Sequence, residues 1–472
     1  MRDPGEGVGN GLALAEFESF SAMPPLEALK GLCSLMTSLK VSKRNKPLKM
    51  KILDISRAHF YGVSRRRVFT NLPEGSEQHG KCALLVKSMY GTLDAASIWQ
   101  ETYSNLLKKH NIKQGVGWPA LFYHAGHDLR FLVHGDDFVC LGDDDAHAFL
   151  ARVLDEEFEY RVDGTIGPDA TDGTTMTVLN RIIGFDKSTG TVSYEADPRH
   201  AEHLVKALKL ENAKPVSTPA EKQKLNEILA SEGMPGLPAE MASQYRSLTM
   251  RAAYLSMDRP DLSECVKSLA RHMQAPSEYA WSKLKRLGRY LLGKMRVVQY
   301  FHPQAEFRTL RVYTDSDHAG CLKTRKSTTG VVLCTGRHCL KHSSNLQSTV
   351  SLSSGESEFY AMVKAAAVGL GAQAMFADWG LKVDVRVLSD SSAARGICSR
   401  RGLGKTRHVQ TRYLWIQEKV SNKEIRVEAV HTQSNLADLC TKPLPQEVCL
   451  KHMGTMGFEF QEGRNTTAKL LS

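Results

Sequence analysis

The chain has 472 residues, of which 42% are hydrophobic and 24% charged; these ordinary values for folded proteins exclude a disordered, collagen-like or coiled-coil chain. The length predicts about three domains, at roughly 150 residues each. Lys and Arg total 62 against 51 Asp and Glu, a net charge of +11, so we expect a polyanionic partner, with a charge that serves only solubility as the alternative.

Ten cysteines are spread along the chain without a Cys-x-x-Cys pair, so neither a disulfide framework nor a zinc ribbon is expected. This distribution favours a reducing, intracellular compartment. The first residues lack the apolar run of a signal peptide. The most apolar stretch, 361–376, is interrupted by Lys364 and Gln373, so we expect no membrane-spanning segment.

The first strand is predicted after a Gly-containing head. Alternating apolar residues from Leu48 indicate a strand that ends in Asp54. Two short apolar runs, 131–133 and 138–141, flank a Gly turn and predict a hairpin with Asp136 and Asp137 at its apex. A double Asp in a turn commonly does no more than shape the turn. A strand-end acid together with such a pair also suits the binding of two divalent ions.

The middle of the chain, about 215–301, reads as helical. Apolar side chains recur at helical spacing through Trp281 and Leu284, while Lys and Arg occupy the other positions. The result is an amphipathic basic helix. A solvated outer face and a nucleic-acid contact are both open interpretations of its charge.

The C-terminal block begins with a predicted strand and hairpin and continues with alternating helices and strands. We expect a helix from near Ser354, a strand over 383–387, helical segments up to Val420 and a short helix from near Ser434. The remaining expected strands are 310–314, 330–334, 338–341, 349–352 and 425–430.

Four acids fall at strand ends or helix starts in this block: Asp315, Glu358, Asp390 and Asp438. Each one alone would be a helix cap or a solvated turn residue. Gathered at one sheet edge, they would repel one another unless a cation neutralised them. An all-oxygen set suits Mg²⁺ or Mn²⁺, and two such ions can drive the in-line displacement of a phosphodiester.

The four acids lie within a set of six characteristic runs, which are Tyr313-Thr-Asp-Ser-Asp-His-Ala-Gly320, Thr324-Arg-Lys-Ser-Thr-Thr-Gly330, Ser353-Ser-Gly-Glu-Ser-Glu-Phe-Tyr-Ala361, Leu388-Ser-Asp-Ser391, Thr406-Arg-His-Val-Gln-Thr-Arg-Tyr413 and Ala437-Asp-Leu-Cys-Thr-Lys-Pro-Leu444. In order and spacing these runs resemble the ribonuclease H domain of copia-type (Ty1/copia) LTR retrotransposon Pol polyproteins. The resemblance implies that Asp315, Glu358, Asp390 and Asp438 are catalytic and bind metal. Glu356 is the rival of Glu358, although the Glu-Phe-x-Ala run favours Glu358.

Other polar residues in and near these runs have predicted or open roles. We predict phosphate contacts from the basic residues Arg325, Lys326, Arg407 and Arg412. His431 precedes the last acid, where a proton shuttle and an ordinary surface histidine are both open interpretations. Asp317 is an additional acid without an assigned role.

The N-terminal acids also lie in runs that are similar to the reverse transcriptase palm of the same family, which implies that Asp54, Asp136 and Asp137 are catalytic and that Asp54 and Asp136 bind metal. The resemblance extends over about 26–445. The matching runs are Leu53-Asp-Ile-Ser-Arg-Ala-His-Phe-Tyr-Gly62, Lys87-Ser-Met-Tyr-Gly-Thr-Leu-Asp-Ala-Ala-Ser-Ile-Trp99, His134-Gly-Asp-Asp137 and, in the family's connecting region, Tyr245-Arg-Ser-Leu248, Arg259-Pro-Asp261 and 281–291.

The chain departs from the family pattern near the palm acids. His134-Gly135 replaces the usual Tyr-Val, and His59 stands at a commonly aromatic position that screens the nucleotide sugar. The run 90–99 lacks a Lys and an Arg of the family and gains Asp94, which is unfavourable in a pocket that handles a polyanion. The basic fingers segment of the family is not found, so we expect a polyprotein fragment or a decayed copy with impaired polymerase activity.

The sequence therefore predicts an α+β or α/β multidomain fold, with a truncated palm that lacks fingers, a helical connection region and a ribonuclease H-like mixed sheet. We expect RNA-directed DNA polymerase and ribonuclease H functions on primer-template and RNA·DNA hybrids, or alternatively a catalytically inactive nucleic-acid-binding relic. We expect other Pol or Gag products of the element as further partners, and a location in the cytoplasm (virus-like particle) or nucleus. The expected boundaries are a divergent head (1–45), a palm (46–175), a thumb- or connection-like region (176–305), a ribonuclease H-like domain (306–445) and a tail (446–472).

Overall fold

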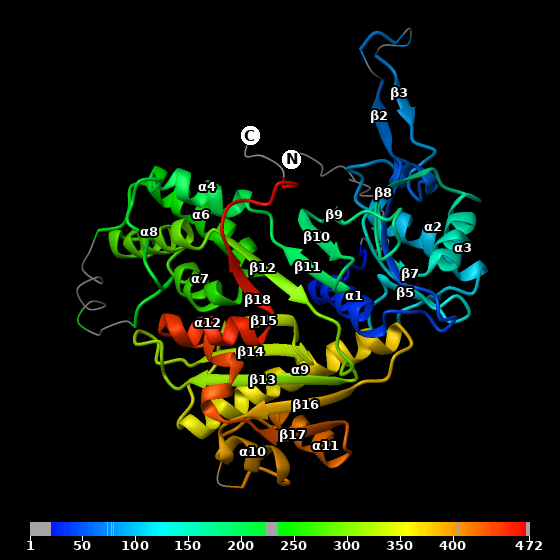
Figure 1. Ribbon diagram of the computed structural model, residues 1–472. Helices are drawn as coiled ribbons and strands as arrows, with labels where there is room; N and C mark the ends of the chain where they lie inside the picture. Colours follow the sequence, from blue (N-terminus) through cyan, green and yellow to red (C-terminus); the bar gives the residue numbers. More distant parts are fainter. Residues whose placement is uncertain are drawn as a thin grey trace, which may run out of the picture.

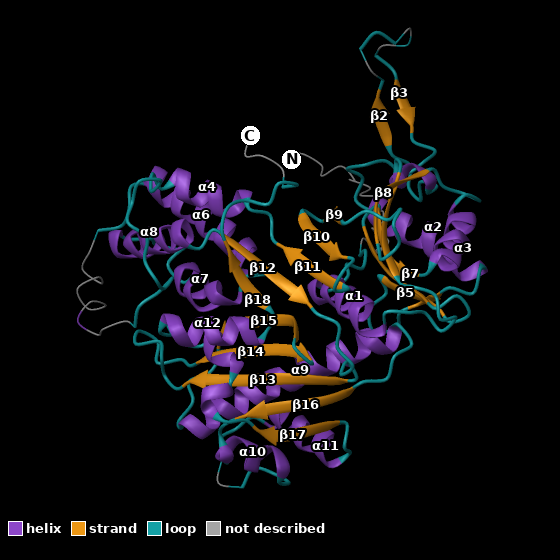
Figure 2. Cartoon of the chain, viewed as in Figure 1, coloured by secondary structure: helices purple, strands orange, loops and turns teal. Residues whose placement is uncertain are grey.

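Strands and helices of the computed structural model alternate in a mixed α/β arrangement (Figures 1 and 2). The structure describes residues 20–468, except 73, 77, 79, 223–225, 227–234 and 405. Within these ranges the strands form three sheets of five or six strands and one separate two-stranded hairpin. The mixed α/β class expected from the sequence agrees with this architecture, while the expected division into domains stays a prediction.

The first sheet has the strand order β4-β5-β6-β7-β1-β8. Helices α2 and α3 cover one face, where Leu53 and Phe131 are buried, and alternate residues such as Ile52 and Leu132 are buried on the other face. The hairpin β2 and β3 projects away from this sheet (Figure 1). The predicted first strand and the Asp136–Asp137 hairpin are confirmed. The bounds are β1 Lys49–Ile55, β2 Phe69–Asn71, β3 Cys82–Leu84, α2 Ala95–Lys109, β4 Lys113–Gln114, β5 Leu121–His124, β6 Leu129–His134, β7 Asp137–Gly142, α3 Asp144–Leu154 and β8 Tyr160–Ile166.

The second sheet, in the order β18-β12-β11-β10-β9, lies beside a group of helices. The helical pattern expected as far as residue 301 is wrong at its end, because residues 296–301 form a strand that is paired on both sides. The segment expected as a tail supplies α12 and the edge strand β18. The bounds are β9 Thr175–Val178, β10 Arg181–Asp186, β11 Thr191–Glu195, α4 Arg199–Ala207, α6 Ala239–Ser256, α7 Ser263–Ala270, α8 Glu278–Gly293, β12 Arg296–Phe301, α12 Gln446–Thr455 and β18 Phe458–Gln461.

The third sheet has the order β15-β14-β13-β16-β17, with β13, β16 and β17 parallel and the others antiparallel. The strand expected over 349–352 is wrong. There the chain turns into α9. The side-chain amide of Gln347 donates hydrogen bonds across the turn to the hydroxyl of Thr329 and the carbonyl of Ser357. The other expected strands are confirmed. The bounds are β13 Thr309–Asp317, β14 Thr328–Thr335, β15 His338–Leu346, α9 Ser354–Asp378, β16 Asp384–Ser389, α10 Ser392–Ser399, α11 Trp415–Ser421, β17 Ile425–Ala429 and the 3-10 turn η5 Leu436–Cys440.

Helix α1 (Leu26–Leu39), from the segment expected as a head, lies among all three sheets. Its residues from Glu27 to Thr37 are buried. Lys30 forms a buried ion pair of 3.4 Å with Asp258, and the hydroxyl of Ser34 lies 2.8 Å from the ring of His338. The core therefore continues from one sheet to the next through this helix.

Helix α9 is long and apolar enough to cross a membrane by length and composition, and 56% of its most apolar window is buried inside the protein. Phe359, Met362 and Phe376 are among its buried side chains, in the same cluster as Val312 of β13 and Val387 of β16. The packing of α9 on the third sheet thus accounts for its apolar character.

Candidate functional site

Three predicted acids meet at one edge of the third sheet. Asp315 is on β13, Asp390 follows the neighbouring parallel strand β16, and Glu358 is in the first turns of α9. Parallel neighbours end at the same edge of a sheet, and the Ser353 side chain caps α9 by accepting the N–H of Glu356 at 3.2 Å. Each of the three acids offers a ligand oxygen, and these oxygens lie within 4.8 Å of one another.

Glu358 is the most perturbed of these acids. Burial of its carboxyl group, reinforced by the charges of Asp315 and Asp390, raises its pKa to about 9. Its Oε1 accepts the N–H of Ser316 at 3.1 Å, whereas its buried Oε2 has no hydrogen-bond partner within the described part of the chain. A buried carboxylate oxygen without a donor, beside two further carboxylates, fits a hard divalent cation such as Mg²⁺ or Mn²⁺.

The fourth acid, Asp438, lies beside Asp315 but pairs with a lysine. Lys442 Nζ is 3.0 Å from Asp438 Oδ1 and 3.8 Å from Asp315 Oδ2. The Thr441 hydroxyl donates to Asp315. Burial, and then the charge of Asp315, raises the pKa of Asp438 to about 6. We did not predict Lys442; its position four residues after an acid in a helical turn was the available signal.

The structure separates the two rival glutamates at the start of α9. Glu356 accepts the hydroxyl of Tyr360 at 2.8 Å, the N–H of Leu352 at 3.0 Å and a bond from the His408 ring at 2.9 Å. Its oxygens are therefore satisfied by protein donors. Glu358 lies in the acidic group instead, as the Glu-Phe-x-Ala run favoured.

The two residues with open roles have local partners. Asp317 accepts the N–H of Thr328, and a Cβ placed on Gly320 would come within 1.9 Å of the Asp317 carboxylate, so Asp317 and Gly320 form a close-packed corner between β13 and β14. His431 is exposed, and its Nδ1 accepts the N–H of Gln433 at 3.3 Å.

The four basic residues predicted to contact phosphates lie on loops and turns of the third-sheet region. Arg325 and Lys326 are in the turn between β13 and β14. Arg407 is exposed beside His408, and the exposed Arg412 guanidinium lies 5.0 Å from the ring centroid of Tyr413. Their contact with nucleic acid stays a prediction.

The N-terminal acids are close in the fold but lie less compactly than the C-terminal group. Asp54 on β1 pairs in register with Asp137 on β7, and Asp136 is in the adjoining turn. Burial, followed by the charges of Asp136 and Asp54, raises the pKa of Asp137 to about 6. The guanidinium of Arg161 lies 3.4 Å from Oδ2 of Asp54. Among the described residues, the close grouping of ligand oxygens seen in the third sheet is not found here.

The unusual residues near these acids have specific partners. Asp94, which we expected to add an unfavourable charge, is buried and forms a two-pronged ion pair with Arg66, which lowers the pKa of Asp94. Arg66 therefore neutralises the gained charge. The indole N–H of Trp99 donates to the carbonyl of Gly135 at 2.8 Å and so holds the acidic turn. His59 stacks on Tyr90 with 4.2 Å between ring centroids.

Comparisons with solved structures and family models give limited similarity. No protein-family model matches the sequence. The structure of a foamy viral protease-reverse transcriptase in complex with RNA/DNA hybrid is similar to 90% of this chain and 48% of that chain, with 13% sequence identity and a TM-score of 0.49.

Curated relatives match nearly the whole length of the chain. The retrovirus-related Pol polyprotein from transposon TNT 1-94 of Nicotiana tabacum is 26% identical over 455 residues, 93% of this chain and 32% of the relative. The Pol polyprotein from transposon RE2 of Arabidopsis thaliana is 25% identical over 83% of this chain and 26% of the relative. An uncharacterized mitochondrial protein of Arabidopsis thaliana is 33% identical over 169 residues, 36% of this chain and 68% of that protein.

The chain spans about a third or less of the length of these polyproteins. The similarity covers the segments with the acids of the first and third sheets. The chain belongs to the retrovirus-related Pol polyproteins of copia-type LTR retrotransposons.

Proposed function

We propose that the chain is a ribonuclease H-type endonuclease that cleaves the RNA strand of RNA·DNA hybrids. The observation that carries this proposal is the group formed by Asp315, Glu358 and Asp390, whose oxygens lie within 4.8 Å of one another. The same proposal assigns residues 46–175 to a reverse transcriptase palm, 176–305 to a connection region and 306–445 to the ribonuclease H-like domain. It places the protein inside the cell, in the cytoplasm or nucleus, with other Pol or Gag products as partners.

The chemistry follows from the ligands that the chain offers. Asp315, Glu358 and Asp390 would hold Mg²⁺ or Mn²⁺, which supplies Lewis acidity toward water and the leaving oxygen of a phosphodiester. The chain itself orients these ligands: the N–H of Ser316 fixes Glu358, and the hydroxyl of Thr441 fixes Asp315. Lys442 holds Asp438 beside Asp315 through ion pairs with both carboxylates.

Cleavage of a labelled hybrid tests the proposal. The purified chain should cut the RNA strand in the presence of Mg²⁺, and Asp390→Asn should abolish cutting while hybrid binding persists. Asp384→Asn is the matched control, because Asp384 is exposed at the far end of the same strand. Equal cleavage by wild type and Asp390→Asn would refute the assignment. Binding without cleavage by the wild type would favour the inactive relic.

We further propose that the chain has little or no primer-extension activity, although RNA-directed DNA polymerase is expected of the family. The guanidinium of Arg161 lies 3.4 Å from Oδ2 of Asp54, a carboxylate that must be free to bind a metal ion. In addition, the acidic turn carries His134-Gly135 in place of the usual Tyr-Val. Phosphoryl transfer depends on precise positioning, worth up to about 7 to 11 kcal/mol. Extension on an RNA template should therefore be near background. Processive extension that is lost in Asp136→Asn would overturn this proposal.

A further inference from the structure

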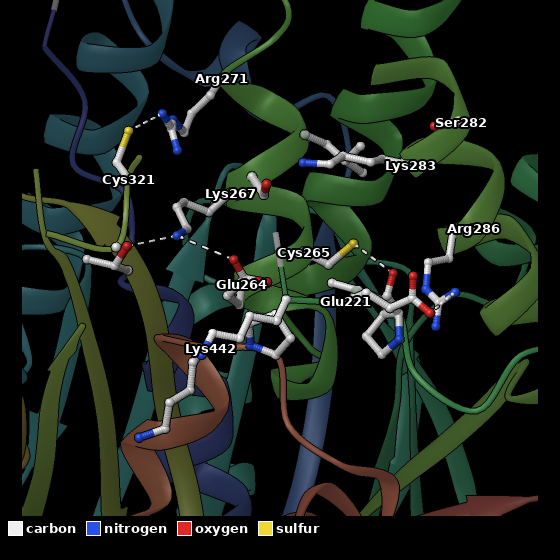
Figure 3. Close-up of a pocket in the computed structure, with 18 of the residues that line it drawn as sticks. Glu221, Glu264, Cys265, Lys267, Arg271, Ser282, Lys283, Arg286, Cys321 and Lys442 are labelled. Carbon is white, nitrogen blue, oxygen red and sulfur yellow. Dashed lines mark hydrogen bonds and ion pairs between the residues drawn. The ribbon is translucent and has the colours of Figure 1, made fainter. Parts of the chain in front are cut away.

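A cavity of about 720 Å³ lies between the helical region and the third sheet. Helices α7 and α8 form one wall, and the turn after β13 together with residues 441–443 forms the other. Figure 3 shows Lys267, Arg271 and Arg286 around this space. The amphipathic basic helix expected from the sequence is α8, so part of its charged side faces a cavity.

The cavity has a strong excess of positive charge. The described residues that line it include eight Lys or Arg side chains and three acids, Glu221, Glu264 and Asp317. Lys285 is exposed, and Arg286 and Arg289 are partly exposed. Concave surfaces with one sign of charge concentrate ions of the opposite sign. This lining favours an anionic ligand with several charges.

Several of these cations are held in place by hydrogen bonds within the protein, two of them across the cavity to the opposite wall. The Lys267 ammonium donates to the Thr328 hydroxyl at 2.9 Å, and Arg271 donates to the sulfur of Cys321. The Arg289 Nε donates to a backbone carbonyl, that of Lys214, at 2.8 Å. Each guanidinium has further N–H donors with which it can bind a phosphate. Because these side chains are already held in place, they lose less conformational entropy when they bind.

The cavity shares residues with the acidic site. Thr441 and Lys442 line it, while the Thr441 hydroxyl bonds Asp315 and Lys442 pairs with Asp438 at 3.0 Å. In Figure 3 the Lys442 side chain extends away from Glu264 and Lys267. The cavity is therefore connected to the acidic site through Thr441 and Lys442.

We propose that this cavity binds the phosphate backbone of the hybrid next to the cleavage point, so that α7 and α8 anchor the strand that the acids cut. The proposal rests on the proposed ribonuclease function. It commits to a nucleic-acid strand, because eight cations line the cavity and two of the lining residues, Thr441 and Lys442, contact acids of the proposed cleavage site. A small polyphosphate is the alternative that the experiment must separate.

The test measures hybrid binding in the Asp390→Asn background, where cleavage does not interfere, between about 50 and 200 mM salt. The double variant Lys285→Gln/Arg289→Gln should bind the hybrid about tenfold more weakly at the low-salt end. The slope of log affinity against log salt should also become shallower by up to about 1.8, because each lost phosphate contact removes about 0.9 from it. The charge-preserving double variant Lys285→Arg/Arg289→Lys should retain the slope. Lys109→Gln, on an exposed side chain of α2, is the control.

The outcomes separate the two proposals. Weaker binding and a lower slope in the neutral double variant support the cavity assignment even if the wild-type chain fails to cleave, which would refute only the ribonuclease function. Affinity and slope equal to those of Lys109→Gln would refute the cavity assignment. Competition with inorganic tripolyphosphate at matched ionic strength gives a second test. If tripolyphosphate displaces the hybrid as strongly from the neutral double variant as from its parent, the cavity assignment is also refuted. Tripolyphosphate that binds in place of the hybrid only when Lys285 and Arg289 are intact would show a small-anion site instead.

Discussion

At the scale of single residues, Lys442 is the side chain that most changes the picture of the acidic site. Its ammonium lies between Asp438 and Asp315, where it neutralises charge that a divalent ion would otherwise neutralise. Asp438 thus has an internal counter-ion 3.0 Å from its Oδ1, whereas the buried Oε2 of Glu358 has neither an ion-pair nor a hydrogen-bond partner within the described residues. The four acids are therefore not equivalent as ligands.

Lys442→Gln should strengthen the binding of Mn²⁺ to the metal-free protein. The change removes a competing positive charge from the acids, and the expected gain in affinity is up to about fivefold. Titration followed by electron paramagnetic resonance of free Mn²⁺ measures it directly. Lys451→Gln, an exposed lysine on α12, is the matched control. A Mn²⁺ affinity in Lys442→Gln that equals the control's would contradict this role for Lys442.

The sequence identified the acids of this site but not the partners that distinguish them. Glu356 and Glu358 are two positions apart. The Glu-Phe-x-Ala run favoured Glu358, but the physical reason lies in the contacts of Glu356 with Tyr360 and His408, which satisfy its oxygens. His408 lies 52 residues along the chain, so no local pattern contains this information. The same is true of Arg66, which pairs with Asp94 from 28 residues away.

At the scale of elements, the docking of α1 depends on a neutral histidine. His338 on β15 donates from Nε2 to the carbonyl of His302 at 2.9 Å, so its Nδ1 accepts from Ser34 of α1 and from Gln304. Burial lowers the pKa of His338 from 6.5 to about 4. The contact is therefore compatible only with the uncharged ring.

Stability should fall as the pH falls from about 6.5 to about 4, because the unfolded state binds a proton that the folded state resists. The contribution of His338 is fully present above the unfolded pKa and amounts to at most about 3 kcal/mol. His338→Gln should flatten this part of the pH dependence in denaturant unfolding. His110→Gln, which removes a partly exposed histidine paired with Glu156, should leave it unchanged. An identical slope in both variants would rule out His338 as the source.

Elements with a clear local pattern were predictable, and those defined by distant contacts were not. The alternation of apolar residues along β1 and the Gly turn between β6 and β7 are local patterns that predict these elements without any distant contact. Residues 349–352 have a strand-like composition but no neighbouring strand to pair with, so they form a turn. Residues 296–301 form a strand because β11 and β18 flank them.

At the scale of the whole molecule, one buried cluster joins the three sheets. It contains Leu32 of α1, Leu132 of the first sheet, Tyr194 of the second and Val312 of the third. The end of α9 adds polar contacts: the Asp378 carboxylate accepts the N–H of Trp118 at 2.8 Å. The sheets are thus packed as one body within the described ranges, which the domain estimate from length alone does not reveal.

This packing predicts that the sheets unfold together. Leu32→Ala should destabilise the protein by about 2 to 5 kcal/mol and shift the tryptophan-fluorescence and far-UV circular dichroism transitions equally. Leu26→Ala is the control on the same helix, because Leu26 is 58% exposed. Two separate transitions, of which Leu32→Ala moves only one, would show that the sheets are energetically independent.

The pairing of β12 with β18 has a consequence for how the protein is made. The two strands are about 160 residues apart, and the entire third sheet is encoded between them. On the ribosome, β12 therefore emerges long before its outer neighbour and presents an open edge to other nascent chains. A chain whose synthesis stops after Thr455 retains every acid discussed above, yet its second sheet stays open at β12. Premature termination at this point should therefore yield aggregates, even though none of these acids is missing.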